Sequence, residues 1–419
     1  MSQSVSLSAP RPAWTQRPDW RVTLPALVLL AGGALYIAGS ESQRMAGLYL
    51  LGGALGLVLY HAAFGFASAW RVFIAEGRGE GLRAQMVMLA LASVLFLPLL
   101  AEGSFFGQGL VGSVAPFAPS VAVGAALFGV GMQLAGGCAS GTLYTVGGGS
   151  TKMVFTLLFF MVGSFLGAAH LPWWFTVAWW PGEARPGGFS LLQEWGLFPA
   201  LAVQLAVFAA IAGATLVIER RRRPAAAAAA AGPAASLAQR LVSGPWPLIW
   251  GAVGLALLNA VTLVSAGHPW NISFGYTLWS GKLAAALGID VGAFDFWTWR
   301  YPARALAGSV FAETTSVMNF GVLAGAFLAA GLAGRFNPAW RLPWRHVLAA
   351  ALGGILMGYG ARIAFGCNVG AFFSGIASGS LHGWLWFLAA LAGSYLGTAL
   401  RPLFGLTGGF ARRAAPQAA

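Results

Sequence analysis

The two cysteines of the chain lie in glycine-rich segments that repeat one another. Residues 131–141 align without a gap with residues 360–370, so Cys138 matches Cys367 at a constant offset of 229 residues. Both segments contain Gly-Cys-x-x-Gly, and their candidate site residues are Gly137, Cys138, Ser140, Gly141, Gly366, Cys367, Asn368 and Gly370. A thiol is a weak S–H donor and, once deprotonated, a soft nucleophile. Two cysteines are too few for a disulfide framework and lack zinc or iron–sulfur spacing, so we expect thiol chemistry without a metal.

A purely structural interpretation of these segments is that glycines allow close helix crossing and that each cysteine is a small buried apolar residue. That interpretation is adequate for either cysteine alone. It is weaker for the pair, because packing does not demand the same residue at matching places in two copies. The repetition therefore favours a functional role for Cys138 and Cys367.

The elements that position these segments must lie in a membrane. Of the 419 residues, 58% are apolar and only 8% are charged, and the mean hydropathy is +0.73. Soluble globular chains carry about a quarter charged residues, so a soluble enzyme, a nucleic-acid-binding protein and a disordered chain are excluded. The lipid bilayer is the expected surrounding, and nucleic acid is not an expected partner.

Apolar stretches of about 20 residues predict transmembrane helices. The chain has ten of them, at residues 22–40, 45–64, 82–101, 119–136, 151–170, 198–218, 246–266, 303–333, 346–365 and 382–400. The eighth stretch is long enough to be broken or strongly tilted. The predicted fold class is an all-α polytopic membrane protein.

The positions of the cations predict the orientation. The net charge of +13 reflects topology signals, because Lys and Arg collect in cytoplasmic loops. With the N-terminus in the cytoplasm, 18 of the 24 Lys and Arg lie inside. We therefore expect a protein of the bacterial inner membrane with both termini in the cytoplasm, and no removable signal peptide.

The same pattern divides the chain into segments. We expect a cytoplasmic tail at 1–21, a first membrane repeat at 22–218, an Arg- and Ala-rich cytoplasmic linker at 219–245, a second repeat at 246–405 and a cytoplasmic tail at 406–419. The tryptophan-rich connection 171–196 is expected to lie outside, in the headgroup region.

Division of the ten spans into two copies of about five has a geometric consequence. Because five is odd, the second copy must enter the membrane from the opposite side, so the repeats are predicted to be inverted. Further echoes support the repeat: residues 163–167 match 393–397, and 64–66 match 274–276. Cys138 and Cys367 are then expected to approach the midplane from opposite faces.

Glycine within the cysteine segments predicts broken or re-entrant helices. Each glycine costs a helix roughly 1 kcal/mol, and the freed backbone groups need partners inside the bilayer. A short helix that restarts at each cysteine would direct its N-terminal N–H groups inward, which suits an anion. Two such termini with a thiol each predict a pathway for an anion with affinity for sulfur.

Arg362 is a second candidate for contact with that anion, because charge within a span is costly. It either neutralises an oxyanion near Cys367 or pairs with Glu313, and the sequence does not decide between these. Gln133 takes the equivalent place in the first repeat. Lys282 and Arg304 are expected as solvated surface cations, with steering of an arriving anion as the alternative. The five histidines form no metal-binding spacing.

These segments resemble the YeeE/YedE family of sulfur-transport membrane proteins, which includes bacterial thiosulfate permeases. The resemblance rests on residues 137–141, 366–370 and 358–362 and extends over about residues 22–405. It implies pseudo-twofold halves and a narrow constriction in which cysteines pass thiosulfate inward by S–H contacts. Members associated with thiosulfate uptake carry a further functional cysteine, whereas the echoing positions here are Gly65 and Gly275.

The sequence therefore predicts uptake of a small sulfur-containing anion, with thiosulfate first, and no enzymatic activity or cofactor. A cytoplasmic thiol or sulfur carrier protein is an expected partner on the inner side. One alternative is a membrane thiol oxidoreductase, although redox dithiols usually lie close together with a lowered thiol pKa. The other is a passive anion channel for another sulfur or selenium species.

Overall fold

The structure, a computed structural model, describes residues 17–179, 188–222 and 236–410. Within this part of the chain the protein is almost entirely helical, and ten helical segments are long and apolar enough to cross a membrane. All ten coincide with stretches predicted from the sequence. The long helices are α1 (Trp20–Ser40), α2 (Gln43–His61), α4 (Glu80–Glu102), α5 (Pro119–Ala135), α7 (Thr151–Trp174), α9 (Leu197–Arg222), α11 (Leu248–Ala266), α15 (Thr314–Leu332), α16 (Trp344–Ile363) and α17 (Leu381–Leu400).

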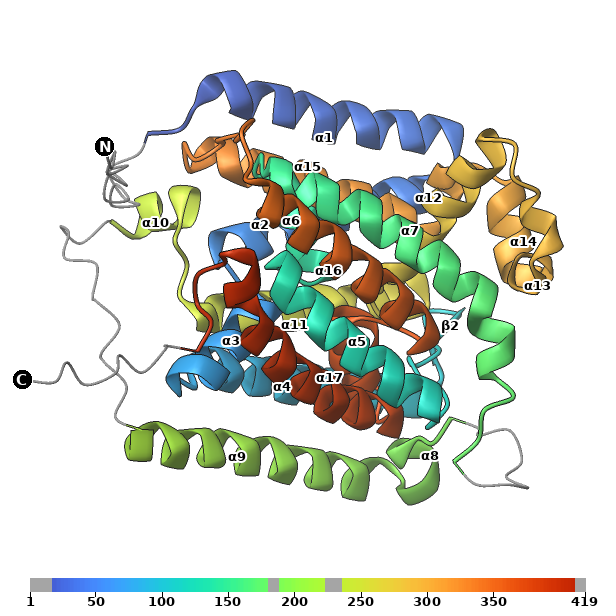
Figure 1. Ribbon diagram of the computed structural model, residues 1–419. Helices are drawn as coiled ribbons and strands as arrows, with labels where there is room; N and C mark the ends of the chain where they lie inside the picture. The colour runs from blue at the N-terminus through green and yellow to red at the C-terminus, as the bar shows by residue number, and fades with distance from the viewer. Residues whose placement is uncertain (1–16, 180–187, 223–235, 411–419) are drawn as a thin grey trace, which may run out of the picture.

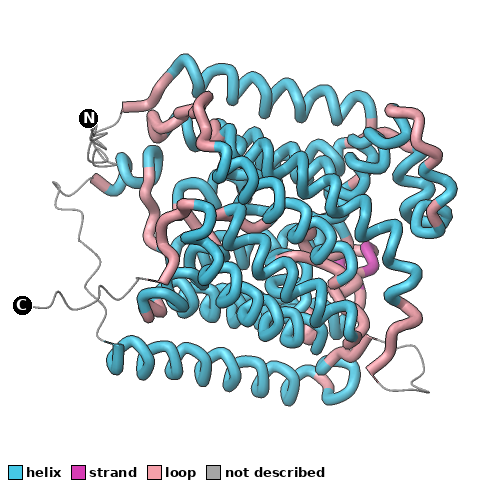
Figure 2. Tube along the Cα trace, viewed as in Figure 1, coloured by secondary structure: helices cyan, strands magenta, loops and turns pink. Residues whose placement is uncertain are grey.

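Shorter elements connect these helices, some at the ends of the bundle and others, such as α6 and η4, in its interior (Figure 2). They are α3 (Phe66–Glu76), the hairpin β1 (Ser104–Phe105) and β2 (Gln108–Gly109), α6 (Ala139–Gly147), α8 (Leu191–Trp195), α10 (Leu237–Ser243), α12 (Ser273–Ala286), η2 (Val291–Ala293), α13 (Asp295–Thr298), α14 (Arg300–Ala307), η3 (Val310–Ala312), the π-helix η4 (Asn368–Gly375) and η5 (Arg401–Phe404). We call the two ends the α10 end and the α14 end, at the left and right of Figure 1.

Three boundaries differ from the sequence prediction. The eighth predicted span is broken, because α14 ends at Ala307 and α15 begins only at Thr314. Helix α7 continues to Trp174, into the connection predicted at 171–196, whose residues 180–187 lie outside the described part. Helix α9 continues to Arg222, past the predicted end of the first repeat, and residues 223–235 of the linker also lie outside the described part.

Glu313 explains why the chain restarts as a helix after the break. Its carboxylate caps α15 by accepting hydrogen bonds from the backbone N–H groups of Thr315 (2.8 Å) and Ser316 (2.7 Å). The Tyr301 hydroxyl donates a third bond to it, at 3.0 Å. Burial and the adjacent Glu313 carboxylate raise the pKa of Tyr301 above its ordinary value, so the phenol stays protonated.

Glycines let the central helices touch backbone to backbone. Helices α5 and α16 cross at two places: a Cβ on Gly131 would lie 2.6 Å from the Gly353 carbonyl oxygen, and a Cβ on Gly124 would lie 2.6 Å from that of Gly360. The two contacts are equivalent under the repeat: Gly131 corresponds to Gly360, and Gly353 corresponds to Gly124, at the offset of 229 residues. Each helix therefore offers the other the same surface, as related copies do at a twofold axis.

The outer contacts of this pair are reciprocal in the same way. Gly167 of α7 packs on the Tyr359 backbone of α16, and Gly397 of α17 packs on the matching Val130 of α5. At the periphery, α1 packs on α15 and α9 packs on α4, and Figure 1 shows α1 and α9 on opposite flanks. These contacts are those expected of two copies related by a pseudo-twofold axis in which α9 corresponds to α1, so α9 groups with the second copy, although the predicted bounds 22–218 include it in the first. Inversion across the membrane stays a prediction.

Candidate functional site

The chain leaves helical geometry immediately before each cysteine. Helix α5 ends at Gly136, whose φ of 90° is left-handed, and the matching Phe365 has a φ of 56°. Cys138 (φ −86°, ψ −169°) and Cys367 (φ −115°, ψ −166°) then adopt nearly the same extended conformation. Each cysteine is the N-cap of the next helix, α6 or η4. The helix breaks expected from the glycine pattern are therefore present, at matched positions.

The two cysteine segments meet in the core of the protein. Cys138 is 1% exposed and Cys367 is fully buried, and both belong to the same core cluster. Helix α6 contacts η4, so the two short helices begin near one another in the interior. Tyr276 of α12 lies within electrostatic range of both thiols, and its hydroxyl donates to the Ala139 carbonyl oxygen at 2.9 Å.

Hydrogen bonds surround the Cys138 sulfur. The Gly141 backbone N–H donates to it at 3.4 Å, and the Ser140 hydroxyl lies 3.3 Å from it. The Thr142 hydroxyl donates to the Cys138 carbonyl oxygen at 2.9 Å. This cysteine is thus held in a polar cap of its own helix.

The Cys367 sulfur has a drier environment. Among the described residues its side chain makes no capping hydrogen bond, although the backbone N–H groups of Val369 and Gly370 are directed at the sulfur. Beside it, Asn368 is fully buried, and both polar atoms of its side chain lack a hydrogen-bond partner among the described residues. An unpaired buried amide is costly, so Asn368 is available to a passing ligand.

Space requires glycine at Gly366 and is tight at Gly370, two of the four predicted glycine positions. A Cβ on Gly366 would lie 2.6 Å from the Ala371 backbone nitrogen, and one on Gly370 would lie 3.0 Å from Asn271 Oδ1. Around Gly137 and Gly141 a Cβ would make only ordinary contacts, the nearest at 3.5 Å. The second segment is therefore the more tightly packed.

Two cavities approach the cysteine segments from opposite ends. The cavity at the α14 end has a volume of about 350 Å³ and is lined in part by Ser113, Asn271 and Arg362. It borders η4, because the Ser113 hydroxyl donates to the Gly370 carbonyl oxygen at 3.0 Å.

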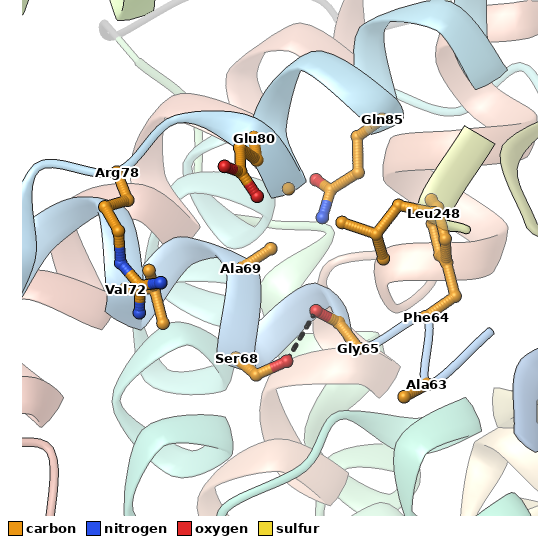
Figure 3. Close-up of a pocket in the computed structure, with 11 residues that line it drawn as sticks. Ala63, Phe64, Gly65, Ser68, Ala69, Val72, Arg78, Glu80, Gln85 and Leu248 are labelled. Atoms are coloured by element: carbon orange, nitrogen blue, oxygen red, sulfur yellow. Dashed lines mark hydrogen bonds between the residues drawn. The ribbon is translucent and has the colours of Figure 1, made fainter. Parts of the chain in front are cut away.

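The cavity at the α10 end has a volume of about 190 Å³ and is lined in part by Gly65, Ser68, Arg78, Glu80 and Gln85 (Figure 3). In Figure 3 the Ser68 hydroxyl donates to the Gly65 carbonyl oxygen, at 3.0 Å. This cavity borders α6, because a Cβ on Gly65 would lie 3.6 Å from the Tyr144 hydroxyl.

Arg362 lies at the α14-end cavity and does not pair with Glu313. Its guanidinium carbon lies 5.1 Å from the centre of the Phe296 ring, and its buried Nε has no hydrogen-bond partner among the described residues. Glu313 instead caps α15. The pairing alternative from the sequence is therefore wrong, because the carboxylate is satisfied by its own helix.

The other candidate cations have different surroundings. Lys282 donates to the carbonyl oxygens of Leu306 (2.7 Å) and Gly308 (2.6 Å), so it holds the end of α14. Arg304 lines a further cavity of about 230 Å³ beside Glu313. No cluster of three or more potential metal ligands occurs among the residues that the structure describes.

Sequence reasoning missed the aromatic and polar residues that frame the thiols. Tyr276 lies in the repeated segment 274–276, but only its glycine was singled out, and Tyr144 follows Cys138 on the same short helix. Ser113 and Asn271 come from connections outside the repeat alignment. A comparison of the two repeats for hydroxyl content would have identified Tyr144 and Tyr276.

Comparisons with known proteins identify the family of this chain. The family model described as sulphur transport matches residues 61–396. The chain is 28% identical to the thiosulfate transporter TsuA of Spirochaeta thermophila over 363 residues, which is 83% of this chain and 96% of that protein. It is 24% identical to TsuA of Escherichia coli over 354 residues, 84% and 93% of the two chains.

The probable transporter YedE of Escherichia coli is a further relative, 31% identical over 163 residues. This match covers 38% of this chain and 39% of YedE, so it spans about two fifths of each. The ten long apolar helices, together with the broad family match, establish a multi-pass membrane protein. The chain belongs to the sulphur transport family.

Proposed function

We propose that this protein takes up a small sulfur-containing anion, with thiosulfate as the first candidate, through a constriction formed at Cys138 and Cys367. The observation that carries the proposal is the arrangement of two buried thiols on two short helices that contact each other. Gly65, which lines the α10-end cavity, lies next to Tyr144 of α6, and Ser113, which lines the α14-end cavity, donates a hydrogen bond to Gly370 of η4. The two named TsuA relatives support thiosulfate as the substrate.

The proposed route begins at the α14 end, which we take to be the outside; the distribution of cations in the sequence supports this orientation. Arg362 supplies positive charge to the cavity there, while Asn271 and Ser113 lead to Gly370 of η4. The anion then passes Cys367 and Asn368, crosses to Cys138 and leaves past Gly65. A buried S–H group donates a hydrogen bond weakly, so it can hold and release a soft anion without a covalent bond. A cytoplasmic sulfur carrier would receive the anion at the α10 end.

The test is uptake of radiolabelled thiosulfate by cells that lack other sulfur permeases. Cys138→Ala and Cys367→Ala should each reduce uptake at least about tenfold, because the proposed relay uses both thiols in series. Protein in the membrane fraction should remain at the wild-type level, because alanine fits the space of a buried thiol. Ala139→Ser, next to Cys138, serves as a control that alters the segment without removing a thiol.

Three outcomes separate the alternatives. Full uptake by either cysteine variant would contradict the relay. No uptake by well-expressed wild-type protein would contradict thiosulfate and direct attention to sulfite, sulfide or selenium analogues. Flux that does not saturate with concentration would indicate a passive channel.

A further inference from the structure

The two cysteine segments match in backbone but differ in side-chain chemistry. At the offset of 229 residues, Ser140 corresponds to Val369 and Tyr144 corresponds to Phe373. The aromatic residues that pack over the two segments also differ by a hydroxyl. Tyr276 packs over α6, whereas its counterpart Phe66 packs against η4. At each of these three pairs the hydroxyl is on the Cys138 side.

Two of these hydroxyls belong to α6 itself and lie between the Cys138 thiol and the α10-end cavity. The Ser140 oxygen lies 3.3 Å from the Cys138 sulfur. The Tyr144 hydroxyl lies within electrostatic range of the same sulfur and faces Gly65 on the lining of the α10-end cavity. Among the described residues Tyr144 has no hydrogen-bond partner that would occupy it. The Tyr276 hydroxyl, in contrast, is committed to the Ala139 carbonyl oxygen.

The Cys367 side offers a ligand far less. Val369 and Phe373 are fully buried and apolar. Phe372 of the same helix packs in an aromatic cluster with Trp70 at 5.6 Å and Phe387 at 5.1 Å between ring centres. Asn368 is the one side chain of this segment with unpaired polar atoms among the described residues. This side is suited to exclude water more than to retain an anion.

We propose that Ser140 and Tyr144 are specificity-determining residues that make the Cys138 side the binding station for the oxygen atoms of a sulfur oxyanion. The Cys367 side is then an apolar gate. This inference rests on the proposed uptake function and narrows its substrate class to sulfur anions that carry oxygens. Hydroxyl groups donate strong hydrogen bonds to anionic oxygens but only weak ones to bare sulfur, so a hydrosulfide ion gains little at this station.

The experiment compares hydroxyl deletions beside Cys138 with hydroxyl deletions elsewhere in the protein. The deletions are Ser140→Ala and Tyr144→Phe, and each should raise KM for labelled thiosulfate about tenfold with little change in maximal rate, because each removes one bond to a charged group. Ser93→Ala in α4 and Tyr395→Phe in α17 are the matched controls, because they delete a hydroxyl of the same two residue types outside both cysteine segments, and neither should shift KM comparably. Ser140→Thr retains the hydroxyl and should restore much of the affinity.

Equilibrium binding of labelled thiosulfate to purified protein separates failure of this inference from failure of the uptake function. If the wild type binds thiosulfate and both deletion variants bind it with the same affinity, the proposed role of Ser140 and Tyr144 is wrong, while the proposed uptake function is unaffected. A wild type that neither binds nor transports would overturn uptake itself. In competition, sulfite should displace the label and hydrosulfide at the same concentration should not; equal displacement would overturn the oxyanion class.

Discussion

At the scale of single residues, Arg362 shows how a site can be distinguished from a structural ion pair. A buried Arg–carboxylate pair loses stability when one partner is removed, but Glu313 is already satisfied by the N-terminus of α15. Arg362 instead packs on Phe296 at the edge of a cavity. Its charge is therefore available to an anion in that cavity.

Arg362→Ala should raise KM for anion uptake about tenfold without lowering the amount of folded protein. Arg362→Lys should recover part of the affinity, because it keeps the charge but not the planar donor fork. Initial uptake rates over a range of concentrations give KM, and immunoblots of membranes give protein amount. Arg44→Ala is the control: Arg44 is a cation that binds the Ser265 and Ala266 carbonyl oxygens at the end of α11. Reduced protein with an unchanged KM would assign Arg362 a packing role.

The residue scale also shows where sequence reasoning succeeds. Cys138, Cys367 and the glycines around them repeat in the sequence, so their shared backbone conformation could be predicted. The role of Glu313 could not, because it depends on a helix break whose position only packing determines. The unequal hydroxyl content of the two sides was visible in the sequence, but its meaning required the positions of Tyr144 and Tyr276 in space.

At the scale of elements, the long helices were predictable because lipid demands continuous apolar stretches. All ten appear, and the over-long eighth stretch is broken, as its length suggested. Short elements such as α12 and η4 were not predictable in detail, because they are stabilised by surrounding helices. The π-helix geometry of η4, a form often found at functional sites, has no signature in this sequence.

Gly131→Val tests the crossing of α5 and α16. The added side chain would meet the Gly353 backbone, which cannot move aside, so we expect a loss of about 1–3 kcal/mol of stability or more. Thermal unfolding followed by size-exclusion chromatography in detergent measures the change. Gly47→Ala in α2 is the control, because a Cβ there meets nothing within 4 Å. A wild-type melting temperature in the Gly131 variant would show that the helices can separate at this point.

At the scale of the whole molecule, the orientation in the membrane follows from the positive charges and is open to direct measurement. In a background of Cys138→Ala and Cys367→Ala, we introduce Phe106→Cys at the α14 end or Trp340→Cys at the α10 end; the native side chains are 96% and 83% exposed. A membrane-impermeant maleimide applied to intact spheroplasts should label the first variant only. Labelling of the second should require permeabilised membranes. The reverse pattern would invert the proposed direction of uptake.

The close crossing of α5 and α16 has a consequence for movement. Each cysteine is attached to the end of one of these two helices, and the helices touch at the Gly131–Gly353 and Gly124–Gly360 contacts with no side chains between them. A rocking motion of one half against the other would have to open these contacts and leave a void along the centre of the protein. We therefore expect α5 and α16 to stay in contact at both crossing points. The two thiols would then remain at a fixed separation. In such a protein the anion would pass between two halves that do not move relative to one another, and only side chains along its path would change position.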